Sequence, residues 1–263
     1  MRSVSDAPAR AAELERLADE WRGCAKCALS ASRTQVVVGT GHPDADLMFV
    51  GEAPGFHEDK QGAPFVGQAG QVLDRLLQTI GLSRPDVYIA NVLKCRPPGN
   101  RDPQPEEIEA CEGHLFAQVE LIRPKVVCTL GNFATKLLSG RPEGITRVRG
   151  VPQLRELGGR AVFLYPIFHP AAALRTPAML ERLRQDFQRL PELLAQEVPD
   201  LADMSGERPA PVPEPIPPPI PEPSPPPIPE PAPTPIPEPY PPPELVGARS
   251  AAGAAEDDQL GLF

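Results

Sequence analysis

The chain has 263 residues, of which 41% are hydrophobic and 23% are charged, and its formal net charge is −9. No run of about 18 apolar residues occurs, which argues against a membrane-spanning helix. The amino-terminal residues also lack the apolar core of a signal peptide, so we expect a cytoplasmic protein. In that compartment the five cysteines favour metal ligation or free thiols over disulfides.

Apolar periodicity predicts alternating strands and helices along the first two hundred residues. In chain order these are a helix at 10–22, strands at 35–39 and 46–51, a helix at 68–80, a strand at 87–95, a helix at 106–121, a strand at 125–131, a helix at 132–139, a strand at 163–170 and a helix at 177–195. Such alternation predicts an α/β fold, a doubly wound parallel sheet with helices on both faces.

Polar loops follow three of the predicted strands, after Val50, Ala90 and Phe168. In folds of this class, ligands bind in the crevice at the carboxyl ends of the strands. We therefore expect the three loops to meet at one site.

Four of the five cysteines are spaced like metal ligands. Cys24 and Cys27 form a C-x2-C pair, and Cys95 and Cys111 a C-x15-C pair. Four thiolates hold either a structural zinc ion or an iron–sulfur cluster, and the spacing alone leaves both open. Cys128 lies in an apolar run, KVVCTLG, and we expect it to be a core thiol.

The charge and the prolines divide the chain into unlike parts. Residues 1–198 carry 24 basic and 24 acidic side chains, whereas residues 199–263 carry 2 and 11. Nucleic acid would therefore have to meet a local basic face rather than bulk charge. Residues 209–243 contain 21 prolines, which exclude helix and sheet. We predict a globular domain over 1–198 and a disordered polyproline II linker over 199–258, a plain spacer rather than an SH3 ligand.

Four motifs together resemble the family 4 uracil-DNA glycosylases, the iron–sulfur type. They are GEAPG at 51–55, PFVGQAG at 64–70, NVLKCRPPGNRDP at 91–103 and HPAAAL at 169–174. The resemblance covers about residues 20–195. It implies a three-layer α/β/α sandwich with a mostly parallel four-stranded sheet. It also implies a [4Fe–4S] cluster on Cys24, Cys27, Cys95 and Cys111, acting as a structural staple, and a monofunctional hydrolase that leaves an abasic site in DNA.

Uracil in a duplex must be flipped out, stacked on a ring and read along its pairing edge. The resemblance makes Phe65 the stacking ring and Gly51 part of the pocket, although Phe65 could be an ordinary core residue. Asn91 directly follows a predicted strand. Its amide offers the donor and acceptor that suit uracil O4 and N3–H, and it would reject cytosine. The alternative role for Asn91 is a turn or cap.

Breaking the N-glycosidic bond leaves negative charge on uracil and positive character on the sugar. His169, at a strand end, fits the donor that stabilises the departing base at O2. By resemblance, Glu58 and Asn100 position water or the sugar cation, and Glu52 shapes the pocket. Asp59 is a weaker candidate than Glu58, and both could belong to an ordinary solvated loop.

The segment HPAAALRTP resembles a loop that enters the minor groove. Leu174 would fill the space left by the flipped base, unless it is buried. Arg175, Arg96 and Arg101 would contact phosphates. A covalently trapping subgroup has an insertion, Lys-Arg-Arg-Ile-His, where this chain has PPGNRDP, so we expect an enzyme that turns over.

The last residues resemble the peptide by which bacterial DNA-processing proteins bind the replicative sliding clamp. Gln259 supplies a polar anchor, and the apolar residues would fill a groove; these are Leu260, Leu262 and Phe263. Such a tether raises local concentration near new DNA.

Two other readings stay open. One is a non-catalytic uracil- or DNA-binding iron–sulfur module recruited to the clamp, and the other is a zinc-stapled nucleic-acid module. Nothing in the sequence suggests more than a monomer.

Overall fold

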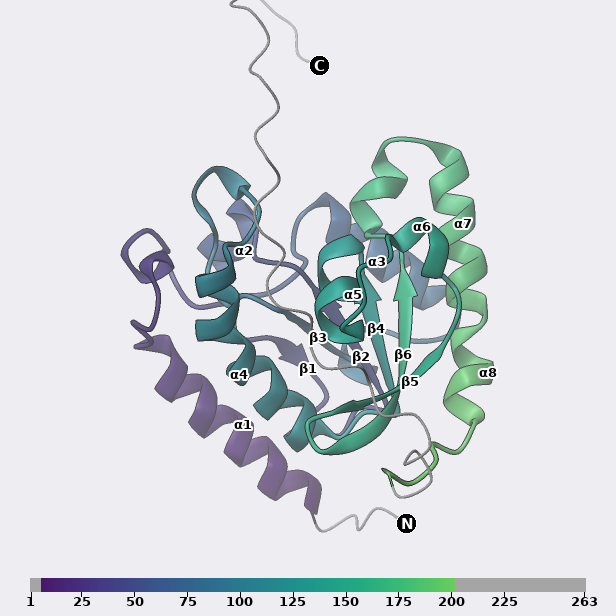
Figure 1. Cartoon of the computed structure of the whole chain (residues 1–263), viewed down its shortest axis with the longest axis horizontal. Helices are drawn as coiled ribbons and strands as arrows, with labels where there is room; N and C mark the ends of the chain where they lie inside the picture. Colours follow the sequence, from purple (N-terminus) through teal and green to yellow (C-terminus); the bar gives the residue numbers. More distant parts are fainter. Residues whose placement is uncertain (1–5, 202–263) are drawn as a thin grey trace, which may run out of the picture. The chain divides into compact units, whose positions relative to one another are not determined.

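A computed structural model describes residues 6–201 (Figure 1). The predicted terminal peptide and most of the predicted linker lie outside these residues, so their assignment stays a prediction. The strands are β1 (Thr40–Gly41), β2 (Leu47–Gly51), β3 (Tyr88–Asn91), β4 (Val126–Leu130), β5 (Gln153–Leu157) and β6 (Arg160–Ile167). The α-helices are α1 (Asp6–Arg22), α2 (Phe56–Gln61), α3 (Gln68–Gln78), α4 (Pro105–Ile122), α5 (Asn132–Ser139), α6 (Ile145–Val148), α7 (Pro177–Gln188) and α8 (Leu190–Ala195).

The sheet has six strands in the order β1-β3-β2-β4-β6-β5. Strands β3, β2, β4 and β6 are parallel, which confirms the four-stranded parallel core. Two antiparallel edge strands add to it: β1 beside β3, and β5 beside β6. Strand β5 was not predicted, because its sequence QLREL is charged and largely half-exposed, as edge strands are.

The predicted strand at 35–39 is wrong. Val36 and Val37 are buried. The segment nevertheless makes only one backbone hydrogen bond to the segment beside it, from Val37 N–H to Lys94 O at 2.8 Å. An apolar run that is buried without a partner ladder gives the same sequence signal as a strand. The ladder forms only at β1, two residues long.

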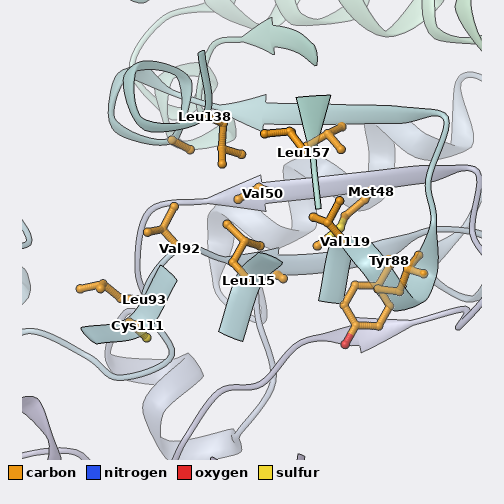
Figure 2. Packing of buried hydrophobic residues seen from close by; sticks show 14 of the residues in the cluster. Met48, Val50, Tyr88, Val92, Leu93, Cys111, Leu115, Val119, Leu138 and Leu157 are labelled. Atoms are coloured by element: carbon orange, nitrogen blue, oxygen red, sulfur yellow. The ribbon is translucent and has the colours of Figure 1, made fainter. Parts of the chain in front are cut away.

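Side chains alternate between two apolar layers along each central strand, as the pleat requires. Met48 and Val50 of β2 face the layer under α4 and α5, part of which Figure 2 shows. Leu47 and Phe49 face the layer under α3, α7 and α8. Cys128 of β4 is fully buried and is a free thiol, which confirms its core role.

The helix predicted at 177–195 is divided in two. Helix α7 ends at Gln188 and α8 begins at Leu190, with Pro191 in its first turn. Proline removes a backbone donor and suits a first turn better than a helix interior, which explains the division. No helix among residues 6–201 combines the length and apolar character needed to cross a bilayer.

Candidate active site and cysteine cavity

Three polar loops leave the carboxyl ends of neighbouring parallel strands. Gly51 ends β2 and Asn91 ends β3, and the two residues are paired across the ladder. His169 follows β6 by two residues, with Gly131, after β4, packed against it. The topology therefore gathers the predicted site residues of all three loops at one edge of the sheet, as expected.

Gly51 lies where no side chain fits. A Cβ on this residue would overlap the amide oxygen of Asn91 and would lie 2.8 Å from Cζ of Phe65. The Asn91 amide and the Phe65 ring thus approach the backbone of Gly51 from two sides. We call the group formed by Gly51, Phe65, Asn91 and His169 the slot.

The Phe65 ring stacks loosely on the His169 imidazole, with ring centroids 5.5 Å apart and planes 28° from parallel. Phe65 has a φ of 54°, a left-handed conformation that is costly for a bulky residue. Arg84 donates to the carbonyls of Pro64, at 3.0 Å, and Phe65. Its Nε also pairs with Asp74 of α3 at 2.6 Å. Arg84 therefore holds the strained turn at Phe65 through its backbone carbonyls and ties it to α3.

Glu58 of α2 supports the same turn through the backbone N–H groups that follow Phe65. Its Oε1 accepts hydrogen bonds from the backbone N–H of Val66 at 3.0 Å and Gly67 at 3.1 Å. Its neighbour Asp59 is buried and accepts instead from Thr34 N–H at 2.9 Å. Of the two carboxylates, only Glu58 is thus bonded to the loop that carries the Phe65 ring.

His169 has a defined hydrogen-bonding state. Its Nδ1 accepts from Ala171 N–H at 3.1 Å, so in the neutral ring the proton lies on Nε2. Burial lowers the pKa of His169 to about 4, against a smaller opposing effect of Glu58. The imidazole is therefore neutral at pH 7, with Nε2–H available as a donor.

Two other predicted catalytic residues lie apart from this stack. Glu52 follows Gly51, and burial, together with the charge of Asp102, raises its pKa. Asn100 is exposed in the turn Pro98–Asn100, and its amide oxygen accepts from Arg96 Nε at 2.7 Å. The hydrogen bond described for Asn100 thus goes to Arg96 rather than to a residue of the slot.

The predicted DNA-contacting residues differ in their availability. Leu174 is 48% exposed at the end of the turn Pro170–Leu174, and Arg175 beside it is exposed as well. Arg101 instead forms a bidentate ion pair with the buried carboxylate of Glu107. Its Nη1 donates to Oε2 at 2.9 Å and its Nη2 to Oε1 at 2.5 Å. A phosphate bound by Arg101 would have to share its guanidinium with Glu107.

The four spaced cysteines line a single cavity and are free thiols. Two of the sulfurs already accept hydrogen bonds. Arg33 donates to Cys95 Sγ at 3.5 Å, and Lys94 N–H donates to Cys111 Sγ at 3.2 Å. Within residues 6–201, however, no three Cys, His, Asp or Glu side chains gather closely enough for one metal ion. Four sulfurs around one cavity, two of them with N–H donors, are a donor set of the kind that holds a thiolate-bound metal group.

Lys94 connects this cavity to the slot, a role that the sequence did not reveal. Its side chain is fully buried, and Nζ donates to Asn91 O at 2.8 Å and to Gln118 Oε1 at 2.6 Å. Burial lowers the pKa of Lys94 to about 8. The only sequence signal was the position of Lys94 between Asn91 and Cys95.

Comparisons with known proteins agree with this geometry. The family model of the uracil DNA glycosylase superfamily matches residues 38–192. A type-4 uracil-DNA glycosylase of Archaeoglobus fulgidus is 45% identical over 194 residues, 72% of this chain and 98% of the relative. The type-4 enzyme of Sulfurisphaera tokodaii is 44% identical over 185 residues, 68% and 84% of the two chains. That of Thermotoga maritima is 48% identical over 163 residues, 62% and 83%.

Proposed function

The chain belongs to the uracil-DNA glycosylase superfamily, and we propose that it hydrolyses the N-glycosidic bond of uracil in DNA, the first step of base excision repair. The observation that carries this proposal is the slot. An amide and an aromatic ring approach Gly51 from two loops, and a neutral imidazole from a third loop stacks on that ring. The relatives are called glycosylases, so a non-catalytic binding module is not favoured.

In the proposed reaction, the extruded uracil lies on the Phe65 ring and pairs with the Asn91 amide. The amide accepts from uracil N3–H and donates to O4, a pattern that cytosine cannot meet. Nε2–H of His169 donates to uracil O2 as negative charge develops there. Because the imidazole is already neutral, it could lose the Nε2 proton only by becoming an imidazolate, so it donates a hydrogen bond without transferring the proton and the uracil leaves as an anion.

The water and the sugar cation require a carboxylate, and we propose Glu58 for that role. Its Oε1 is held by two N–H groups, which keeps the group in place, and its Oε2 lies beside Gly55. Glu52, with its raised pKa, shapes the pocket wall. Asn100 would have to exchange its bond with Arg96 for one with the sugar or the water.

We also propose that the cysteine cavity holds a [4Fe–4S] cluster on Cys24, Cys27, Cys95 and Cys111. The donor set and the N–H···S bonds fit a thiolate-bound metal group, and the resemblance to the iron–sulfur family favours a cluster over zinc. When bound, the cluster supplies a rigid link between the segment around Cys24, the loop after β3 and helix α4, without redox chemistry in base removal. Chemical analysis should find four iron and four sulfide per chain, whereas one zinc and no sulfide would contradict the proposal.

Further proposals concern partners and location. Leu174, with Arg175 and Arg96, contacts the DNA around the flipped base, and the protein acts as a cytoplasmic monomer. Gln259, Leu260, Leu262 and Phe263, outside the described residues, bind the sliding clamp. Clamp binding should disappear when residues 259–263 are removed, and equal binding by both forms would contradict the tether.

The test of the main proposal is incubation with an oligonucleotide that contains one uracil, followed by alkaline cleavage. His169→Ala and Asn91→Ala should each lower the single-turnover rate by about 100-fold or more, as loss of an oxyanion donor does. Cys128→Ser, in the core away from the slot, is the control and should cost stability more than rate. No strand cleavage by the wild-type protein would overturn the proposal.

A further inference from the structure

Phe56 is an exposed aromatic side chain beside the slot, and neither the sequence motifs nor the proposed chemistry uses it. It is the first residue of α2 and is 46% exposed. Two cations lie over its ring. Nζ of Lys60 is 4.7 Å from the ring centroid, and Cζ of Arg96 is 5.1 Å from it.

The two cations come from the loops that build the slot. Lys60 lies on α2, which follows the loop after β2, and Arg96 lies in the loop after β3. Glu58, on the same short helix, is bonded to the backbone beside Phe65. The cluster of Phe56, Lys60 and Arg96, which we call the cation clip, therefore lies next to the slot.

No carboxylate neutralises either cation among residues 6–201. The hydrogen bond of Arg96 goes to the neutral amide of Asn100, and no ion pair of Lys60 occurs in this part of the chain. Elsewhere in the domain arginines pair with acids, as Arg101 does with Glu107 and Arg149 with Asp186. Glu58 and Asp59 lie on the same helix but accept hydrogen bonds from backbone N–H groups, so the two cations at the ring have no described carboxylate partner and can interact with an external anion.

Holding two like charges together costs electrostatic energy in the free protein, and the ring offsets part of that cost. The face of an aromatic ring carries negative potential and attracts a nearby ammonium or guanidinium. An arrangement of this kind is stabilised further when an anion comes between or beside the cations. A bound anion is therefore the natural complement of the clip.

We propose that the cation clip binds a phosphodiester of the DNA strand that flanks the nucleotide in the slot. This inference rests on the proposed function, because it takes DNA as the substrate. Arg96 supplies a planar fork for two phosphate oxygens, and Lys60 supplies a second point charge. Phe56 holds both in place without contacting the reacting atoms. The clip thus positions the strand and does not read its sequence.

The test measures binding to a labelled single-stranded oligonucleotide without uracil, at several salt concentrations, with the full-length protein. Lys60→Gln should reduce the slope of log K against log salt by about 0.7, the value for one phosphate contact on a single strand. Phe56→Leu should raise Kd about 2- to 5-fold, because the cations lose the ring that orders them. Lys125→Gln is the control, since Lys125 directly precedes β4, at the amino ends of the parallel strands, and pairs with Asp46 at 3.8 Å; it should leave the slope unchanged.

A second measurement separates this inference from the proposed function. In single-turnover excision of uracil by Lys60→Gln, the protein concentration for half-maximal rate should rise by a larger factor than the maximal rate falls. An unchanged salt slope in Lys60→Gln would overturn the clip even if uracil is excised. If Phe56→Leu binds DNA more weakly while Lys60→Gln keeps the wild-type Kd and salt slope, the ring stacks on a base instead of ordering the cations. That result would also overturn the cation clip. Absence of excision by the wild-type protein would overturn the function without altering the salt measurement.

Discussion

Replacement of Arg84 tests whether the slot depends on a strained turn that is held from outside. Arg84→Met removes the hydrogen bonds to the carbonyls of Pro64 and Phe65 and the ion pair with Asp74. The Phe65 backbone, at a φ of 54°, stores about 1–3 kcal/mol that these bonds offset. If the turn relaxes, the ring leaves the slot. Because 1.36 kcal/mol corresponds to one factor of ten, kcat/KM should fall about 5- to 150-fold.

Stability should change much less than activity. The side chains of Arg84 and Asp74 are 30% and 39% exposed, so solvent screens the ion pair, which contributes at most about 1 kcal/mol. Loss of the hydrogen bonds to Pro64 and Phe65 is offset by release of the backbone strain at Phe65, so we expect a net loss of about 1 kcal/mol. For a domain of this size that loss lowers Tm by about 2–4 °C. Arg84→Lys should recover only part of the activity, since an ammonium cannot reproduce the planar fork.

Single-turnover excision and thermal unfolding of the same preparations check these values. Arg184→Met is the matched control, because Arg184 makes an exposed pair with Glu181 on α7 and should change neither quantity appreciably. Wild-type kcat/KM in Arg84→Met would refute the reasoning. So would an activity loss that merely follows the unfolded fraction.

Three further predictions concern single residues. Gly51→Ala should lower both excision and Tm, because the Cβ overlaps the slot walls and overpacking costs about 1–3 kcal/mol; Gly113→Ala, in α4 with open space around it, should instead raise Tm. The NMR signal of His169 should not titrate between about pH 8 and 5.5, since its pKa is about 4. This pKa lies below the usual value near 6.5, so the unfolded chain binds the proton at a higher pH than the folded chain does. The contribution of His169 to the free energy of unfolding therefore falls as the pH decreases from about 6.5 towards 4. Lys94→Met should leave the Asn91 carbonyl without its ammonium donor and lower the free energy of unfolding by about 1–3 kcal/mol, measured with denaturant.

The central strands could be predicted because each is an apolar run bounded by turn residues. β2 and β4 are buried along their whole length, and such runs are distinctive in sequence. The edges could not be predicted in the same way. Residues 36–38 are apolar and yet form no ladder, with a single backbone bond from Val37 to Lys94, whereas β5 is paired in the sheet and yet largely polar. Whether an edge segment joins a sheet depends on what lies beside it, which the local pattern does not contain.

In the site, too, some residues could be predicted from the sequence and others could not. Gly51, Asn91 and His169 could be predicted to lie close together, because parallel topology brings the carboxyl ends of the strands to the same side of the domain. Their supports could not. Arg84 reaches the Phe65 turn from 19 residues away, and Lys94 reaches Gln118 across 24 residues. Such contacts depend on the packed structure, and an arginine or lysine in a sequence gives no sign of them.

The supports also explain how a slot made from loops can be rigid. Phe65 is held by Arg84 and Glu58, and Asn91 is held by Lys94, which also bonds to Cys111 in the cysteine cavity. The hydrogen bonds described thus run from Cys111 through the backbone and side chain of Lys94 to the backbone carbonyl of Asn91, whereas Phe65 is held by contacts that do not involve the cysteine cavity. The end of β3, from which the Asn91 side chain projects, is therefore bonded to the cysteine cavity, and the turn that carries the Phe65 ring is supported separately.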